Sequence, residues 1–382
     1  ADIVGTQVLI ESDGGRRVYL DRTAFYPASG GQPFDTGVLG GVRVVEVVDE
    51  EARIAHLLES PVKAAGVEGV VDWNRRFDHM QQHTGQHLLS AVLEELFGYH
   101  TVSVHFGADI ATLDLDAASL TPPEIRRSEK RANDIVFENR PVTVAFEDAG
   151  TTTGLRKKTE RAGSIRIVTI ANLDRSACGG THLRATGEVG PILIRKAERV
   201  KKQVRLEFLC GGRAIARARS DLDILSGLAV ANSAVIDDLP ALVAKQRGDL
   251  KAAGATRRAL EEELNGLRAR DLYHQAAPDA AGRRRIVHRA QTGSAEELRG
   301  LAQALTALPN VAFVGALASP PTLFLSSSPD TGLDAGAILK PVLGELDGRG
   351  GGSARLAQGT VPGPGALGTA LARLTTVLSS AD

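Results

Sequence analysis

Two short motifs that lie far apart in the chain constrain its fold more than any other feature. The stretch 79-HMQQHTGQHLLS-90 spaces three histidines at intervals of four residues, so a helix would carry them on one face. The stretch 178-CGGTH-182 places a cysteine and a histidine on either side of two glycines, which disfavour a helix and allow a tight loop. If these side chains act as one set, the fold has to bring a helix and a distant loop together.

Such a set is suited to zinc. Thiolate and imidazole are preferred ligands of Zn²⁺, and two helical histidines with Cys178 and His182 would supply a tetrahedral set of four. The spacing alone allows either His79 with His83 or His83 with His87 as the helical pair. The residues between these histidines lack the glutamate of a His-Glu-x-x-His motif, which argues against a zincin-type peptidase.

The hydrophobic pattern divides the chain into four parts. Residues 1–75 alternate apolar and polar side chains in short runs, which predicts a small β-barrel-like domain. Residues 76–212 begin with the histidine-bearing helix and continue with strand and helix patterns, as an α+β domain does. Residues 213–278 have a helical pattern, and residues 279–382 alternate strand and helix signals, which predicts a small α/β domain.

The helical part carries a coiled-coil-like stripe. Nine positions between residues 239 and 267, spaced alternately by four and three, hold seven apolar side chains. Such a stripe needs a partner helix. The partner could be residues 213–231 folding back, or a second copy of the chain.

Composition narrows the environment and the partners. With Cys178 and Cys210 as the only two cysteines, disulfides do not organise the chain, and a reducing cytoplasm is expected. No long apolar run and no secretory pattern are present, so no membrane association is expected. The net charge is −1, so nucleic-acid binding would rest on local basic clusters. These clusters are residues 126–131, 155–163, 195–205 and 283–285.

Four stretches together resemble the editing domain of alanyl-tRNA synthetase and the AlaX-type trans-editing proteins. They are 25-FYPASGGQPFDTG-37, 79-HMQQHTGQHLLS-90, 165-IRIVTIANLDRSACGGTH-182 and 187-GEVGPI-192. Residues 213–275 are similar to the helical linker of this family, and residues 332–359 are similar to the DHHA1 domain that ends its long members. The resemblance implies an α+β multidomain protein with a barrel, a zinc editing domain, a helical linker and a DHHA1-like domain.

The resemblance also implies the metal ligands and the reaction. In the family motif the helical ligands flank Thr-x-x, which gives His83 and His87 here and leaves His79 outside the set. The implied activity is hydrolysis of the ester bond in tRNA(Ala) that has been charged with the wrong amino acid. Serine is the implied amino acid, and glycine is a second candidate. The stretch before the histidine helix is too short for the aminoacylation half of a synthetase, so we expect editing in trans without ATP. A homodimer formed through the C-terminal region is a further expectation.

Four protein ligands would fill a tetrahedral zinc ion, whereas a catalytic zinc usually keeps one position open. The metal could gain a fifth ligand, lose one, or only organise the pocket. In the last case a nearby polar group would assist the reaction, and the candidates are His105, Asp174 and Thr181.

Selection of serine over alanine has a physical basis, because a pocket that bonds the serine hydroxyl leaves polar groups unpaired when alanine enters. We expect a threonine hydroxyl near the metal, from Thr84 or Thr181, to make that bond. Gly30 and Gly31, in the sharp loop of the first matched stretch, are further candidates for substrate binding.

Other functions stay open from the residues alone. A zinc-stabilised tRNA-binding module without catalysis fits the closed ligand set and the basic clusters, and would show salt-dependent tRNA binding without turnover. A hydrolase of small aminoacyl esters or amides fits the metal set but gives the C-terminal domain no role. A phosphoesterase built on the glycine-rich stretch 348–352 is less favoured, because no acidic metal cluster accompanies it.

Overall fold

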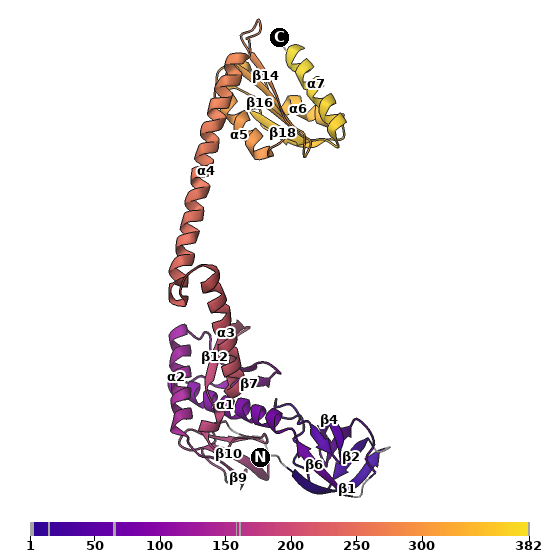
Figure 1. Cartoon of the computed structure of the whole chain (residues 1–382), viewed down its shortest axis with the longest axis vertical. Coiled ribbons are helices and arrows are strands. Elements are labelled where there is room, and N and C mark those ends of the chain that lie inside the picture. The colour runs from indigo at the N-terminus through magenta and orange to yellow at the C-terminus, as the bar shows by residue number, and fades with distance from the viewer. Residues whose placement is uncertain (1–3, 14–15, 64–65, 158, 160–161, 381–382) are drawn as a thin grey trace. The chain divides into compact units, whose positions relative to one another are not determined.

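The structure, a computed structural model, describes residues 4–13, 16–63, 66–157, 159 and 162–380. The chain forms two compact units, residues 1–233 and 234–382 (Figure 1). Within the described ranges no single helix is long and apolar enough to cross a membrane. One bent pair of helices, Gly211–Ala231 and Ile236–Gln275, reaches the required length and apolar composition only when the two are taken together.

The first unit begins with a closed antiparallel barrel (Figure 1). Its strands follow the order β1-β2-β5-β4-β3-β6, and the pairing of β1 with β6 closes it. Their bounds are β1 Val4–Asp13, β2 Arg17–Leu20, β3 Gly37–Leu39, β4 Val42–Asp49, β5 Ile54–Leu58 and β6 Gly66–Val71. Val18, Val44 and Leu58 are buried in the barrel, as the two-residue period of strands requires. The predicted barrel is confirmed.

Helix α1, Trp73–Phe97, follows the barrel directly. Its first turn is capped by the carboxylate of Asp72, which accepts a hydrogen bond from the backbone N–H of Arg75. Gly98 ends it with a φ of 70°, a conformation that favours glycine. Residues 82–93 are all buried, so part of the histidine row lies inside the protein.

Two antiparallel sheets contact α1. The larger has the order β12-β13-β8-β7, with β12 Ile192–Val200, β13 Gln203–Cys210, β8 Ala111–Leu115 and β7 Thr101–Phe106. The smaller has the order β11-β10-β9, with β11 Asp174–Ala177, β10 Ser164–Ile170 and β9 Val142–Asp148. Helix α2, Pro122–Glu138, starts with a capping box and packs beside α1 and β12, and the short helix η1 spans Thr186–Val189. One hydrophobic core joins these elements, and it includes Leu88, Leu113, Val168 and Leu206.

The predicted helical linker is divided between the two units. Helix α3, Gly211–Ala231, ends the first unit, and after the short helix η2, Ile236–Asp238, helix α4, Leu239–Gln275, belongs to the second. Leu250 and Leu260 on α4 are 76% and 59% exposed, so the predicted stripe lies on the surface there. The end of α4 is held by packing instead, since Ala269 belongs to a core cluster of the second unit. The partner of the stripe stays a prediction.

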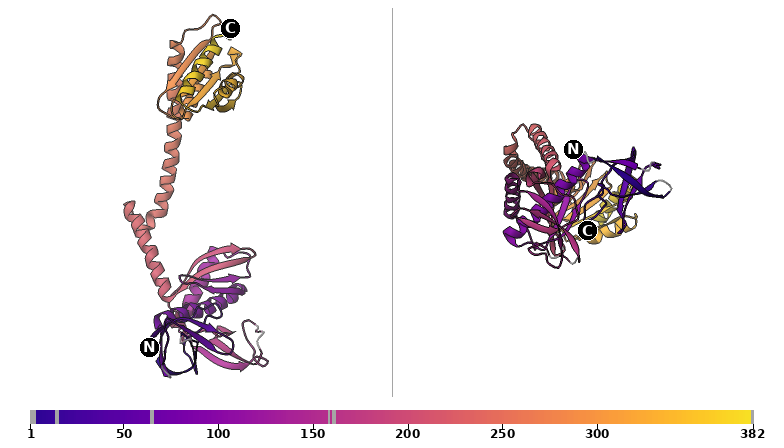
Figure 2. Two further views of the ribbon diagram at one scale, coloured as in Figure 1. Left: turned by 90° about the vertical axis from the view of Figure 1, so that its right-hand side faces the viewer. Right: turned by 90° about the horizontal axis from the view of Figure 1, so that it is seen from below.

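The second unit is a three-layer α/β domain (Figures 1 and 2). Its sheet has the order β14-β15-β16-β18-β17, with β14 Arg284–Ala290, β15 Val311–Leu317, β16 Thr322–Ser327, β18 Leu356–Thr360 and β17 Arg349–Gly352. The pair β14 and β15 is parallel and the other pairs are antiparallel. One face packs on α4 and α5, Ala295–Thr306, and the other on α6, Ala335–Gly344, and α7, Pro364–Ser380. A short helix η3, Pro329–Thr331, follows β16.

The glycine-rich stretch 348–352 is not a free loop. Most of it forms the edge strand β17, which pairs with β18. A Cβ on Gly350 would collide with the backbone of Gln358 and Gly359, so close strand packing accounts for this glycine. The stretch therefore gives no support to a phosphate-binding loop.

Candidate metal centre

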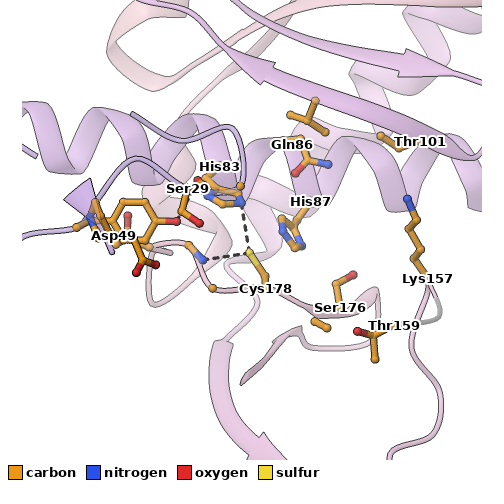
Figure 3. A pocket seen from close by; sticks show the side chains of 18 of the residues that line it. Ser29, Asp49, His83, Gln86, His87, Thr101, Lys157, Thr159, Ser176 and Cys178 are labelled. Atoms are coloured by element: carbon orange, nitrogen blue, oxygen red, sulfur yellow. Dashed lines mark hydrogen bonds between the residues drawn. The ribbon is translucent and has the colours of Figure 1, made fainter. Parts of the chain in front are cut away.

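The structure brings His83, His87, Cys178 and His182 together, with one potential ligand atom of each within 4.8 Å of all the others. The Sγ atom of Cys178 lies 3.4 Å from Nε2 of His83 and 3.3 Å from Nε2 of His182. Figure 3 shows His83 and His87 on neighbouring turns of α1, with Cys178 facing them. Side chains from the helix and from the loop 178–182, called the glycine loop below, thus form a single cluster.

The glycine loop is shaped by its backbone contacts. Cys178 follows β11 directly, and an Nη atom of Arg166 donates hydrogen bonds to the carbonyl oxygens of Cys178 and Gly180, each at 2.8 Å. A Cβ on Gly180 would collide with the ring of His83, whereas Gly179 faces open space. The absence of a side chain at Gly180 lets the loop reach the helix.

Two of the histidine rings are oriented by polar side chains behind them. Nδ1 of His83 lies 2.9 Å from Oε1 of Gln32, and Nδ1 of His182 lies 3.1 Å from Oγ1 of Thr84. These contacts occupy the far nitrogens and leave Nε2 of both rings directed at Cys178. Residues that hydrogen-bond the far nitrogen of a histidine ligand fix its tautomer and its orientation.

The third ring, His87, is oriented by a buried carboxylate. Nδ1 of His87 lies 2.8 Å from Oδ2 of Asp174, which is 4% exposed. Arg156 donates from Nε to the other oxygen of Asp174 at 2.7 Å, and Ser176 donates to the same carboxylate. Burial opposes the charge on both partners. Nevertheless, the hydrogen bond between them lowers the pKa of Asp174 and raises the pKa of His87 to about 9 in the metal-free cluster.

The protonation states of two other residues suit metal binding. Burial alone would raise the pKa of the Cys178 thiol, but hydrogen bonds from His182, His83 and His87 bring it down to about 2. Burial lowers the pKa of His182 to about 3, so its imidazole is neutral. Once His87 gives up its proton on metal binding, one thiolate and three imidazoles with oriented rings form a donor set that fits Zn²⁺.

A cavity of about 820 Å³ opens over the cluster. Its walls come from residues 23–27, 29 and 30 of the barrel domain, from α1, from residues 101–104 of β7 and from the glycine loop. Lys157 and Thr159 line a further side of the cavity (Figure 3). Its volume lies within the range of small-molecule sites.

The proposed substrate-binding residues differ in their access to this cavity. Thr181 and Gly30 line it. Gly31 lies beside them with a φ of 84°, and a Cβ there would come within 3.2 Å of the backbone oxygen of Val104. Thr84 is fully buried and does not line the cavity, so its hydroxyl is placed to orient His182 and not to contact a substrate.

The residues predicted to assist the reaction beside the metal also differ in their access to the cavity. Thr181 is at the cavity wall, whereas Asp174 lies behind His87 and acts on that ring. His105 is exposed on β7 and is outside the cavity lining. His79, one turn before His83, is buried without joining the cluster, and burial lowers its pKa to about 4.

Sequence reasoning missed two residues that shape the site, Gln32 and Arg166. Gln32 is 2% exposed and comes from the barrel domain, where its position directly after Gly30-Gly31 was the available signal. Its amide also donates to Oγ1 of Thr181 at 2.8 Å and accepts from the backbone N–H of Thr181. Arg166 stands in the matched stretch before Cys178, but no pattern links its guanidinium to the loop carbonyls.

Replacing Asp174 by asparagine is expected to weaken zinc binding by about 10- to 100-fold, because His87 loses its charged orienting partner. Competition with a chromophoric chelator measures this affinity directly. Asp114→Asn is the matched control, since Asp114 is also buried and paired with an arginine, Arg205, but lies outside the cluster. Equal zinc affinity in Asp174→Asn and wild type would contradict the orienting role.

Comparison with known proteins gives related sequences over most of the chain. Residues 165–206 match the family described as the threonyl and alanyl tRNA synthetase second additional domain. The chain is 33% identical over 365 residues to an alanine–tRNA ligase of Pyrococcus abyssi. The matched region covers 91% of this chain and 39% of the ligase. It is 29% identical over 360 residues to the alanyl-tRNA editing protein AlaX-L of Pyrococcus horikoshii, covering 90% of this chain and 87% of that protein.

A vertebrate relative and a solved structure match smaller parts. The alanyl-tRNA editing protein Aarsd1 of Danio rerio is 34% identical over 242 residues, which cover 59% of this chain and 58% of that protein. The C-Ala domain of Aquifex aeolicus alanyl-tRNA synthetase is 27% identical, covering 25% of this chain and 91% of that domain, with a TM-score of 0.23. The chain thus spans 39% of the ligase and 58% of the Aarsd1 protein.

Proposed function

Because this chain belongs to the AlaX-type alanyl-tRNA editing proteins, we propose that it hydrolyses the ester bond of tRNA(Ala) charged with the wrong amino acid. The observation that carries this proposal is the cavity over the cluster of one cysteine and three histidines. Action in trans is supported by the match over 87% of AlaX-L, which is named as an editing protein and not as a ligase. Serine is the proposed wrong amino acid, with glycine as a second substrate.

Zn²⁺ is the proposed cofactor, held by His83, His87, Cys178 and His182. When bound, it would supply positive charge that polarises the ester carbonyl or a water molecule. The protein's own contribution is orientation, because the histidine rings are fixed from behind by Gln32, Asp174 and Thr84. Removal of these contacts would loosen the ring positions without removing a ligand.

Thr181 is the proposed group for selecting serine. Its oxygen accepts a hydrogen bond from Nε2 of Gln32, so its own hydroxyl hydrogen is left to donate into the cavity. A serine hydroxyl can accept that bond, whereas the methyl group of alanine cannot. The correctly charged tRNA would therefore bind with a polar group left unpaired.

Thr181→Val is expected to lower kcat/KM for Ser-tRNA(Ala) by about tenfold, which corresponds to one lost hydrogen bond, while the slow hydrolysis of Ala-tRNA(Ala) stays unchanged. The measurement is release of labelled serine and labelled alanine in parallel reactions. Thr101→Val is the control, because Thr101 lines the cavity but its hydroxyl donates to the buried Ser90. An unchanged ratio of the two rates in Thr181→Val would remove Thr181 as the selecting residue.

The direct test of the proposed function is release of labelled serine from Ser-tRNA(Ala) by the full chain. Fast release of serine with little release of alanine would support editing. Binding of tRNA without release would favour a zinc-stabilised tRNA-binding module, an alternative that the closed set of four ligands supports. Equal turnover of a small seryl ester and Ser-tRNA(Ala) would favour a general ester hydrolase.

We further propose that the protein acts in the cytoplasm, because its only two cysteines, Cys178 and Cys210, are both free thiols, as is usual in a reducing compartment. ATP is not expected to take part, since hydrolysis of an aminoacyl ester requires only water. A homodimer formed through the C-terminal region is also proposed. The exposed leucines of α4, such as Leu250 and Leu260, offer an apolar stripe for it.

A further inference from the structure

The hairpin formed by β12 and β13 is strongly basic although the whole chain is nearly neutral. Residues 195–207 contain six basic and two acidic side chains, against a net charge of −1 for the chain. The hairpin turns at Lys201, whose φ is 58°, and Lys201 and Lys202 are both exposed there. The positive charge is thus concentrated at a projecting turn.

Ion pairs neutralise the base of this hairpin but not its tip. Arg195 pairs with Asp221, Lys196 with Glu198 at 2.5 Å, and Arg205 with Asp114 at 2.8 Å.

The remaining three basic residues are Arg199, Lys201 and Lys202. Within the described ranges no acidic side chain forms a salt bridge with any of them, and Arg199 donates only to the backbone oxygen of Lys201. Three exposed, uncompensated cations therefore sit close together at the tip of the hairpin.

The tip lies at the same end of the sheet as one wall of the cavity. Thr101 on β7 lines the cavity, and its register partner on β8 is Leu115. Leu115 is paired in turn with Val204 on β13, and Val204 is paired with Arg199 on β12. This row crosses four neighbouring strands, and at about 4.8 Å per step Arg199 is roughly 15 Å from Thr101. The sheet therefore fixes the distance and the direction between the metal cavity and the cationic tip.

We propose that the β12–β13 tip binds the phosphate backbone of an RNA duplex whose single-stranded 3′ end enters the cavity. This inference rests on the proposed function, which requires an RNA 3′ end at the metal cluster. Lysine and arginine without acidic partners are the side chains that neutralise phosphates, and such contacts position a nucleic acid without reading its sequence. A rigid sheet between the two sites holds the duplex at one distance from the reacting ester.

The test is the double variant Lys201→Gln/Lys202→Gln, assayed with Ser-tRNA(Ala) and with seryl-adenosine, a 3′ ester that lacks a duplex. The expected result is a KM for Ser-tRNA(Ala) about tenfold higher, with kcat unchanged and with seryl-adenosine hydrolysis unchanged. The plot of log Kd for tRNA against log salt should become less steep by about 2, one for each lost phosphate contact. Lys201→Arg/Lys202→Arg, which keeps both charges, should restore the wild-type KM and slope.

Arg43→Gln/Lys63→Gln is the matched control, because both residues are exposed on the barrel domain and removing them takes away the same charge. An unchanged KM and salt slope in the Lys201→Gln/Lys202→Gln variant would overturn the proposal, as would an equal loss of seryl-adenosine hydrolysis. A change in oligomeric state in place of tRNA affinity would assign the tip to a protein contact and also overturn it. Failure of the proposed function is distinguishable, because wild type itself would then release no serine from either substrate.

Discussion

Replacement of Cys178 by alanine is expected to abolish both zinc binding and deacylation. Cys178 is the only thiolate in the cluster, and its Sγ atom contacts Nε2 of both His83 and His182. Loss of a metal ligand lowers metal affinity and activity more than loss of a residue that orients a ligand. We therefore expect kcat/KM to fall by more than about 100-fold. Zinc content after dialysis and release of labelled serine from Ser-tRNA(Ala) measure the two effects separately.

Cys210→Ala provides the matched control for this result. Cys210, the last residue of β13, is completely buried against Gly85 of α1, and burial raises the pKa of its thiol, so it is a neutral packing residue. Its replacement should cost some stability, on the order of 1 kcal/mol for the small cavity that it leaves, while zinc content stays at the wild-type level. Normal zinc content and activity in Cys178→Ala would refute the assignment of this cluster as the metal centre.

Gly180→Ala should be nearly as damaging, although it changes no polar group. A Cβ at this position would collide with the ring of His83, so either the ring or the loop has to move. The loop is held by hydrogen bonds from Arg166 to the carbonyl oxygens of Cys178 and Gly180, and the ring is held by Gln32. Overpacking of this kind costs about 1–3 kcal/mol, which predicts a loss of zinc affinity of roughly 5- to 150-fold.

The neighbouring glycine separates this steric effect from a general effect of loop rigidity. Gly179→Ala adds the same methyl group one residue earlier, where no atom lies within 4 Å of the added Cβ. Its zinc affinity should match that of wild type. Similar losses in Gly179→Ala and Gly180→Ala would show that loop flexibility matters and not the contact with His83. Chelator competition on the folded full-length variants makes the comparison.

The sequence predicted those parts of the site that follow from local spacing. Intervals of four residues placed His79, His83 and His87 on one helical face, the family resemblance selected His83 and His87, and the two glycines placed Cys178 and His182 on one loop. Alternation of apolar and polar residues predicted the N-terminal barrel. In each case the period of a helix or a strand determines the outcome within a few residues.

Contacts between distant segments were beyond such reasoning. No period connects Gln32 with His83, because the barrel has to close before the loop that carries Gln32 can reach α1. The spacing of residues likewise could not distinguish Thr84, whose hydroxyl is buried behind His182, from Thr181 at the cavity wall. The chain of helical patterns after residue 213 also gave no sign that the two compact units divide it between residues 233 and 234.

The barrel takes part in the proposed metal centre, and this limits how the protein can be dissected. Asp35 of the barrel domain forms a buried ion pair with Arg76 in the first turns of α1, and Gln32 orients His83, a proposed metal ligand on that helix. A fragment that starts at Trp73 would retain all four ligands, yet it would expose the Arg76 charge and leave one imidazole free to rotate. The smallest fragment of this chain that is expected to keep the proposed activity therefore includes the N-terminal domain, even though that domain supplies none of the atoms that would bind the metal.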